Sequence, residues 1–247
     1  MVIDIHAHIW AAHPEEDKAR MLKAAEMYDI EKIYVSGLKN YISDEEEIDY
    51  LNDLVYKAMR EDSHFGGAVY VNPMNKNVMD VIRHAVEDRG FEIIKLWVCT
   101  YADVPETDPI MEYAAENGIP VLFHVFHKAT PQVPNETTGI HMANIARRHP
   151  KTKMIMAHLG GNCYDGIPAI RGCRNVWADH SGSIFSGDAI NYSVEYLGAD
   201  RVVFGTDMPG SYLVNVGQIL GADLTEEARD MIFYQNAKQL LDRSFKL

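Results

Sequence analysis

The chain has 247 residues, of which 47% are hydrophobic and 24% are charged, and its net charge is −13. This negative charge disfavours binding to nucleic acid and to anionic membrane surfaces, and no apolar run approaches the roughly 20 residues of a membrane-spanning helix. The length fits either two small domains or one closed α/β barrel, which typically takes about 250 residues.

Cysteine usage and the first residues indicate the compartment. Cys99, Cys163 and Cys173 form no Cys-x-x-Cys pair and leave one cysteine over, which is typical of free thiols in a reducing environment. Met1 leads directly into a strand-like segment without the basic and apolar regions of a secretion signal. We therefore expect a cytoplasmic protein that acts on a small-molecule substrate, without a nucleic acid or membrane partner. The sequence is also compatible with a homo-oligomer.

Strand-like and helix-like segments alternate along the chain. The first predicted strand, residues 2–10, is apolar and rich in β-branched side chains. Seven more strands are predicted at residues 33–36, 68–71, 93–97, 121–124, 153–157, 176–178 and 201–204. Helical spacing of apolar residues predicts helices that begin near Pro14 and Asp44, and further helices at residues 77–88, 110–116, 140–148 and 189–197. Thr225 is a typical helix cap, and the apolar stripe after it predicts closing helices that pack over the last strand.

The spacing of these strands indicates one domain. They follow one another at intervals of about 30 residues, which is the length of a βαβ unit. No linker rich in proline or serine divides the chain, and residues 132–138 read as an enlarged loop after the fifth strand. We therefore predict a single domain over residues 1–247.

Five potential metal ligands lie on predicted strands or at their ends. His6 and His8 alternate on the first strand, so their side chains share a face, while His124, His158 and Asp207 follow the fifth, sixth and eighth strands. A structural role for the histidines in the core is the alternative. Strand ends meet at the active site of a (β/α)8 TIM barrel, and only closure makes the first and eighth strands neighbours. The set therefore predicts this fold and a divalent metal site, with Zn²⁺ favoured over Mn²⁺, Fe²⁺ or Co²⁺.

Several segments resemble the amidohydrolase superfamily. They are His6-Ala7-His8, Ile94-Lys95-Leu96, Val121-Leu122-Phe123-His124, the run from Arg148 to Gly161, the run from Gly198 to Pro209, and the C-terminal helix that ends in Asn236-Ala237. The resemblance covers nearly the whole chain. Within the superfamily, the sequence resembles the amidohydrolase-2 type branch, which includes aminocarboxymuconate semialdehyde decarboxylase and many metal-dependent hydrolases.

The resemblance implies one metal ion held by His6, His8, His124 and Asp207. His158 would lie beside the metal as an acid, a base or an electrophile. Lys95 stands where other branches carry a carboxylated lysine that bridges two metals, but in the branch resembled here this lysine usually is not carboxylated. The alternative for Lys95 is an ammonium that pairs with Asp207 or with a substrate carboxylate.

Four further residues are weaker candidates for substrate contact. Trp10, Trp97 and His127 fall just beyond strand ends, where large aromatic side chains contact substrate or form a wall or lid. His180 belongs to the segment Asp179-His180-Ser181-Gly182, which either lines the pocket or satisfies the amides of a turn.

The sequence favours hydrolysis as the reaction. In it, Asp207 orients a metal-activated water for attack on an amide, ester or lactone of a small carboxylated substrate, and His158 stabilises the oxyanion. The alternative is metal-dependent, non-oxidative decarboxylation of an unsaturated or aromatic acid, with His158 or Asp207 handling the proton. Hydrolysis is preferred because decarboxylation needs an additional apolar pocket, which the loop sequences do not reveal. A barrel that binds a ligand without turnover is disfavoured by the intact ligand set.

Overall fold

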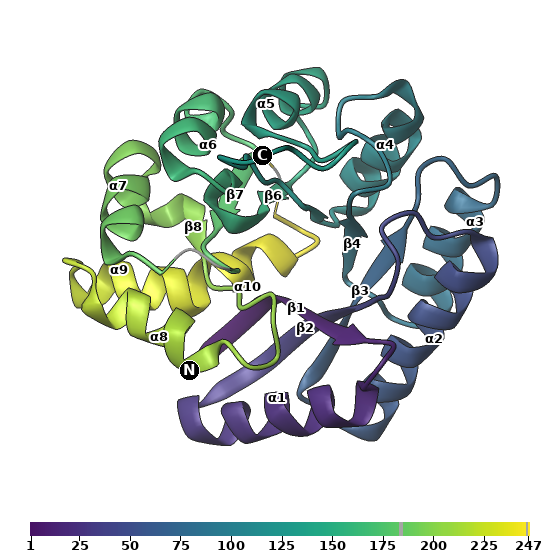
Figure 1. Ribbon diagram of the computed structural model, residues 1–247, viewed down its shortest axis with the longest axis horizontal. Helices are drawn as coiled ribbons and strands as arrows, with labels where there is room; N and C mark the ends of the chain where they lie inside the picture. Colours follow the sequence, from purple (N-terminus) through teal and green to yellow (C-terminus); the bar gives the residue numbers. More distant parts are fainter. Residues whose placement is uncertain (183–184, 246) are drawn as a thin grey trace.

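The computed structural model describes residues 1–182, 185–245 and 247 of the chain. In these residues eight parallel strands form one sheet in the order β1 to β8, so each strand pairs with the next one along the chain. Backbone hydrogen bonds join β1 to the segment after β8, from Ile5 N to Phe204 O (3.1 Å) and from Thr206 N to His6 O (2.9 Å). The sheet thus closes into the predicted (β/α)8 barrel, and Figure 1 shows the helices arranged around the strands.

All eight predicted strands are present, although some are longer or shorter than predicted. The strands are β1 (Val2–Trp10), β2 (Ile30–Leu38), β3 (Phe65–Val71), β4 (Ile93–Leu96), β5 (Val121–Phe123), β6 (Met154–Met156), β7 (Val176–Asp179) and β8 (Val202–Val203). The α-helices are α1 (Pro14–Tyr28), α2 (Glu45–Glu61), α3 (Val78–Arg83), α4 (Asp108–Asn117), α5 (Gly139–Arg148), α6 (Cys163–Ile170), α7 (Gly187–Leu197), α8 (Tyr212–Gly221), α9 (Glu226–Asp230) and α10 (Asn236–Leu241).

Cap residues identify the first residues of two helices, whereas the composition of two others gives no clear helix signal. Asp44 accepts a hydrogen bond from Glu47 N at the start of α2, and Thr225 accepts one from Ala228 N at the start of α9, as their residue types predict. Helix α6 was not predicted, because its Gly166 and Pro168 are poor helix formers. Helix α8 was not predicted either, since its first and last turns carry no charged residues.

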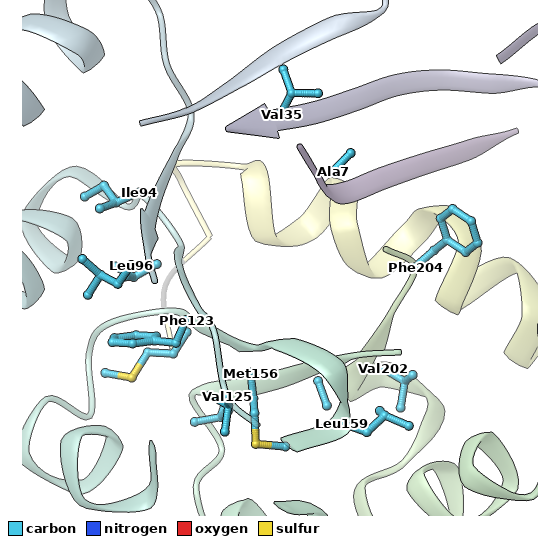
Figure 2. Packing of buried hydrophobic residues seen from close by; sticks show 14 of the residues in the cluster. Ala7, Val35, Ile94, Leu96, Phe123, Val125, Met156, Leu159, Val202 and Phe204 are labelled. Atoms are coloured by element: carbon cyan, nitrogen blue, oxygen red, sulfur yellow. The ribbon is translucent and has the colours of Figure 1, made fainter. Parts of the chain in front are cut away.

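Apolar side chains form an outer and an inner layer along the strands. The outer layer packs the strands against the helices and includes Val35 on β2, Ile94 on β4 and Met156 on β6, which are labelled in Figure 2. The inner layer fills the barrel and includes Ile93 and Ile155, the residues that precede two of these outer positions. This alternation follows from the two-residue period of a strand, and it shows which side chains reach the barrel interior.

The C-terminal helices complete the inner layer. Tyr234, Ala237 and Leu240 pack against the same inner cluster as residues from the strands, and the Lys153 ammonium donates to the Leu240 carbonyl at 2.6 Å. Helix α10 also contacts β1 and β8, which agrees with the predicted packing over the last strand. None of the helices in residues 1–182 and 185–245 has both the length and the apolar character that a membrane crossing requires.

An irregularity in β1 decides where its histidines point. Asp4 pairs with Ile33 and Ala7 pairs with Val35, so three steps along β1 match two steps along β2. Such a bulge adds one residue to one strand and shifts the alternation of the side chains that follow.

The bulge turns the two histidines toward the barrel interior. Before it, Ile5 belongs to the inner layer, so a regular strand would send the even-numbered His6 and His8 outward. After it, Ile9 belongs to the outer layer, and the even-numbered positions therefore face inward. The inward orientation of this His-x-His segment depends on the bulge.

Candidate active site

Five predicted site residues gather at the C-terminal ends of the strands. His6 Nε2 lies 3.0 Å from His8 Nε2, and Asp207 Oδ1 lies 3.1 Å from His8 Nε2 and 3.6 Å from His6 Nε2. Donor atoms of His6, His158 and Asp207 all lie within 4.8 Å of one another. His158 Nε2 lies 3.2 Å from His124 Nδ1, which connects the fifth residue to the group.

Each imidazole has a second partner on its opposite nitrogen. The partners are Asp179 Oδ2 at 2.9 Å from His6 Nδ1, Ser36 Oγ at 2.8 Å from His8 Nδ1, Glu136 Oε1 at 3.0 Å from His124 Nε2, and the Ser181 carbonyl at 3.2 Å from His158 Nδ1. Such contacts orient metal-binding histidines and select their tautomers.

These partners determine which ring nitrogens are free of protons. A carboxylate or a carbonyl only accepts hydrogen bonds, so His6 donates through Nδ1, His124 through Nε2 and His158 through Nδ1. In the neutral rings, the other nitrogen of each histidine then carries a lone pair, and these lone pairs face one another and the Asp207 carboxylate. Converging nitrogen and oxygen lone pairs fit a divalent cation, so the residues present suit the metal that the ligand pattern predicts.

Burial keeps His6, His8 and His124 neutral. It lowers the pKa of His6 to about 3, with help from the nearby Lys95 charge, and it lowers the pKa of His124 to about 4. Burial alone would raise the pKa of Asp207, but the positive charge available on His158 and the hydrogen bond from His8 hold it well below its usual value. At neutral pH His6, His8 and His124 therefore offer neutral imidazoles and Asp207 offers an ionised carboxylate, the forms that bind metals.

The backbone at two of these residues is in the left-handed region. Asp207 has φ 66° and His158 has φ 59°, which is uncommon for residues other than glycine and recurs at functional sites. Asp4 holds the turn before Asp207, since it accepts hydrogen bonds from Thr206 Oγ1 (2.6 Å), Thr206 N (3.2 Å) and His6 N (3.1 Å). These hydrogen bonds tie β1 to the turn that carries Asp207.

Lys95 is buried beneath the histidines. Its Nζ lies 2.8 Å from His6 Nε2, and burial lowers its pKa to about 8 against the attraction of Asp207 and Asp179. It does not belong to the described residues that line the cavity above the donors. Its uncarboxylated state remains a prediction.

A cavity of about 520 Å³ opens onto the donor group. Its described lining includes the predicted Trp10 and Trp97, which pack edge to face with ring centroids 6.1 Å apart. Three further aromatic side chains, Tyr41, Phe126 and Phe185, complete walls that are largely apolar. Sequence spacing did not reveal this pocket, because its walls come from loops after several different strands.

Two of the weaker candidates lie outside the lining of this cavity among the described residues. His180 is fully buried, and its ring packs edge to face against Phe204 at a centroid distance of 5.3 Å. It does not line the cavity among the described residues, because it alternates with Asp179 and Ser181, which face the histidines. His127 is half exposed, pairs with Asp165 at 2.8 Å, and lines a separate cavity beside Phe126.

Sequence patterns do not identify two of the residues that contact the site histidines, and they leave the role of a third open. Ser36 and Glu136 gave no signal, because a serine on a strand and a glutamate in a long loop are common without any role. Asp179 was open to a pocket role or a turn role, and it supports the site and its turn together: it binds His6 and accepts hydrogen bonds from the backbone N–H groups of His158 (3.1 Å) and Ser181 (2.9 Å).

Several solved structures share the fold of this chain. Solved structures similar to this chain include a 2,6-dihydroxybenzoate decarboxylase from Rhizobium, with 17% identity over 97% of this chain and 98% of that chain and a TM-score of 0.77. A dihydroxybenzoic acid decarboxylase from Polaromonas sp. JS666, with bound manganese and the inhibitor 2-nitroresorcinol, has 15% identity over 97% and 96% and a TM-score of 0.73. A 4-oxalomesaconate hydratase from Rhodopseudomonas palustris has 18% identity over 98% and 96% and a TM-score of 0.71.

The sequence comparisons give the family directly. No curated protein sequence matches the chain significantly. The family model described as "Amidohydrolase" matches residues 3–243. Because this match covers nearly the whole chain, the protein belongs to the amidohydrolase family.

Proposed function

We propose that the protein is a metal-dependent decarboxylase that acts on a small aromatic or conjugated unsaturated acid. The observation that carries this proposal is the aromatic cavity directly above the donor group. Trp10, Trp97 and Phe126 present flat apolar surfaces to the same space that His158 and Asp207 enter. Such walls fit a planar conjugated substrate and exclude water from its carboxylate.

The structural relatives support the same reaction class. Two of the solved structures described above are decarboxylases of dihydroxybenzoic acids, and a 5-carboxyvanillate decarboxylase from Sphingomonas paucimobilis has a similar fold, with a TM-score of 0.71. Their identities to this chain lie between 15% and 17%, so they support the proposal through the fold and through the family. This shifts our preference away from hydrolysis, which the sequence patterns alone favoured.

We assign His6, His8, His124 and Asp207 as the ligands of one divalent metal, with Lys95 uncarboxylated. Bound there, the metal would act as a Lewis acid toward substrate oxygens. Zinc suits three imidazoles and one carboxylate, and manganese, iron and cobalt are compatible with the same donors. The four residues would thereby place the carbon that loses CO₂ next to His158.

His158 carries the proton in this proposal. Its Nδ1 is fixed on the Ser181 carbonyl, so Nε2 is the atom that faces the donor group, and the nearby Asp207 carboxylate stabilises positive charge on the ring. A protonated Nε2 gives its proton to the substrate carbon that bears the carboxylate. The bond from this carbon to the carboxylate then breaks, its electron pair returns to the conjugated system, and CO₂ leaves.

A substrate panel tests this function. We expect CO₂ release, followed with a coupled assay, from at least one hydroxylated aromatic or conjugated acid, and we expect His158→Ala to abolish it. A parallel panel of lactones, esters and amides, followed with a pH indicator, measures hydrolysis. Hydrolysis without CO₂ release from any acid would replace this proposal with the hydrolase alternative.

A further inference from the structure

Glu136 is a deeply buried acidic residue in the loop between β5 and α5. It is only 2% exposed, although it lies in a segment without regular structure. Its carboxylate is bound from several sides: Lys128 Nζ lies 2.6 Å from both oxygens, Gln132 Nε2 lies 2.7 Å from Oε2, and His124 Nε2 lies 3.0 Å from Oε1. A buried carboxylate with this many donors is held in one place and remains charged.

The charge of Glu136 determines the tautomer of His124. The Lys128 ammonium contacts both oxygens of Glu136 and forms an ion pair with this carboxylate. An ionised carboxylate only accepts hydrogen bonds, so His124 must donate from Nε2. The lone pair of a neutral His124 is therefore on Nδ1, the nitrogen that lies 3.2 Å from His158 Nε2.

We propose that Glu136 is a positioning residue that presents the Nδ1 lone pair of His124 to the metal site. The inference rests on the metal site of the proposed function and deepens it. It also gives the long loop a role, because the loop supplies the carboxylate that completes a donor attached to β5. Lys128 supports Glu136 from the cavity side, where its ammonium also lies 5.4 Å from the centre of the Phe126 ring.

Loss of this contact has a definite physical consequence. Glu136→Ala leaves the Nε2–H of His124 without its acceptor and frees the ring to rotate or to change tautomer. Removing an outer partner of a metal-binding histidine typically weakens metal affinity by about 10-fold to 100-fold. Glu136→Gln keeps the volume and one neutral acceptor, so we expect a smaller loss.

Binding of Co²⁺ provides a readout that does not depend on turnover. The metal-free full-length protein is titrated with Co²⁺, and both the Kd and the visible absorption spectrum of the bound ion are recorded for each variant. The matched control is Glu16→Gln, which removes an exposed carboxylate that pairs with Arg20 on α1. A second pair of variants, His124→Ala with and without Glu136→Ala, tests whether Glu136 acts through His124.

The expected result is a Kd raised by about 10-fold to 100-fold in Glu136→Ala, a changed Co²⁺ spectrum, and an unchanged Kd in Glu16→Gln. In the His124→Ala background, Glu136→Ala should change the Kd by less than about twofold. An unchanged Kd and spectrum in Glu136→Ala, or an equal loss in both backgrounds, overturns the inference. If circular dichroism shows that Glu136→Ala is unfolded, Glu136→Gln decides, and a Kd equal to that of the parent overturns the inference. A parent protein that binds no Co²⁺ contradicts the proposed metal site as well.

Discussion

The donor group has two halves that are supported in different ways. In the first half, His6 and His8 extend from β1, and their outer nitrogens contact Asp179 on β7 and Ser36 on β2. In the second half, His124 follows β5 and depends on Glu136 of the long loop. Both halves present imidazole nitrogens to one site, but the sheet holds the first and a loop holds the second.

This difference shows which donor residues are positioned by closure of the barrel and which are positioned by a loop. The strand-supported half is set by strand register, by the bulge in β1 and by buried partners, so it is rigid wherever the barrel is folded. The loop-supported half needs its own network of hydrogen bonds. We therefore expect loss of a donor residue of the first half to remove the site, and loss of a supporting partner in either half to weaken it.

The largest expected effect comes from removing ligands of the closing strands. His6→Ala and Asp207→Ala should lose the bound metal and reduce turnover by more than about 100-fold, which exceeds the usual effect of an outer partner. The barrel should remain folded, because these residues lie at the functional face of the strands. Elemental analysis measures the bound metal, and thermal unfolding measures the stability of the barrel. Global unfolding of both variants would contradict the expectation that these residues are needed for metal binding but not for folding.

Asp179→Asn tests whether the contact with His6 supports the strand-supported half of the donor group. The variant replaces the charged acceptor of His6 Nδ1 and disturbs the backbone contacts to His158 and Ser181. We expect metal affinity to fall by about 10-fold to 100-fold and the midpoint of thermal unfolding to decrease. Asp80→Asn is the matched control, since Asp80 is exposed and pairs with Arg83 on the surface. Equal metal affinity in both variants would contradict this assignment.

Acid should destabilise the metal-free protein. Burial lowers the pKa of His6 to about 3 and the pKa values of His124 and His180 to about 4, whereas histidine in an unfolded chain titrates near pH 6.5. Between about pH 6.5 and pH 4 the unfolded state therefore binds more protons, and the free energy of unfolding falls as the pH falls. Asp4, whose pKa burial raises to about 7, opposes this trend with a single proton.

Urea unfolding across this pH range measures the effect. His180→Gln should reduce the loss of stability on acidification, because it removes a buried histidine with a lowered pKa outside the donor group. A free energy of unfolding that stays constant or rises as the pH falls from 6.5 to 4 would contradict the claim that the buried imidazoles are neutral in the folded protein.

The smallest expected effect lies in the substrate cavity. Trp97→Ala removes part of the aromatic wall and should raise KM by about threefold to tenfold with little change in kcat, because it loses contact with the substrate but leaves the donors intact. His127→Ala, in the separate cavity, should leave both constants unchanged. A larger KM effect for His127→Ala than for Trp97→Ala would move the substrate into that neighbouring cavity.

Much of the fold and the convergence of the five potential metal ligands could be predicted from the sequence, because strand periodicity and residue type act locally. His124, His158 and Asp207 follow apolar strands, and closure of the sheet brings them together. The bulge in β1 could not be predicted, since the alternation of Ile3 and Ile5 continues unbroken into Ala7 and Ile9. Glu136 and the cavity walls depend on how loops fold back over the strand ends, and no local pattern encodes that arrangement.

Anomalous diffraction from crystals of the purified protein, measured at the absorption edge of the bound metal, tests the central claim most directly. The account predicts one divalent ion per chain, bonded to His6, His8, His124 and Asp207, with an unmodified Lys95. Two ions bridged by a carboxylated Lys95 would contradict the mononuclear site. No ion after reconstitution with zinc or manganese would contradict the metal-dependent function itself.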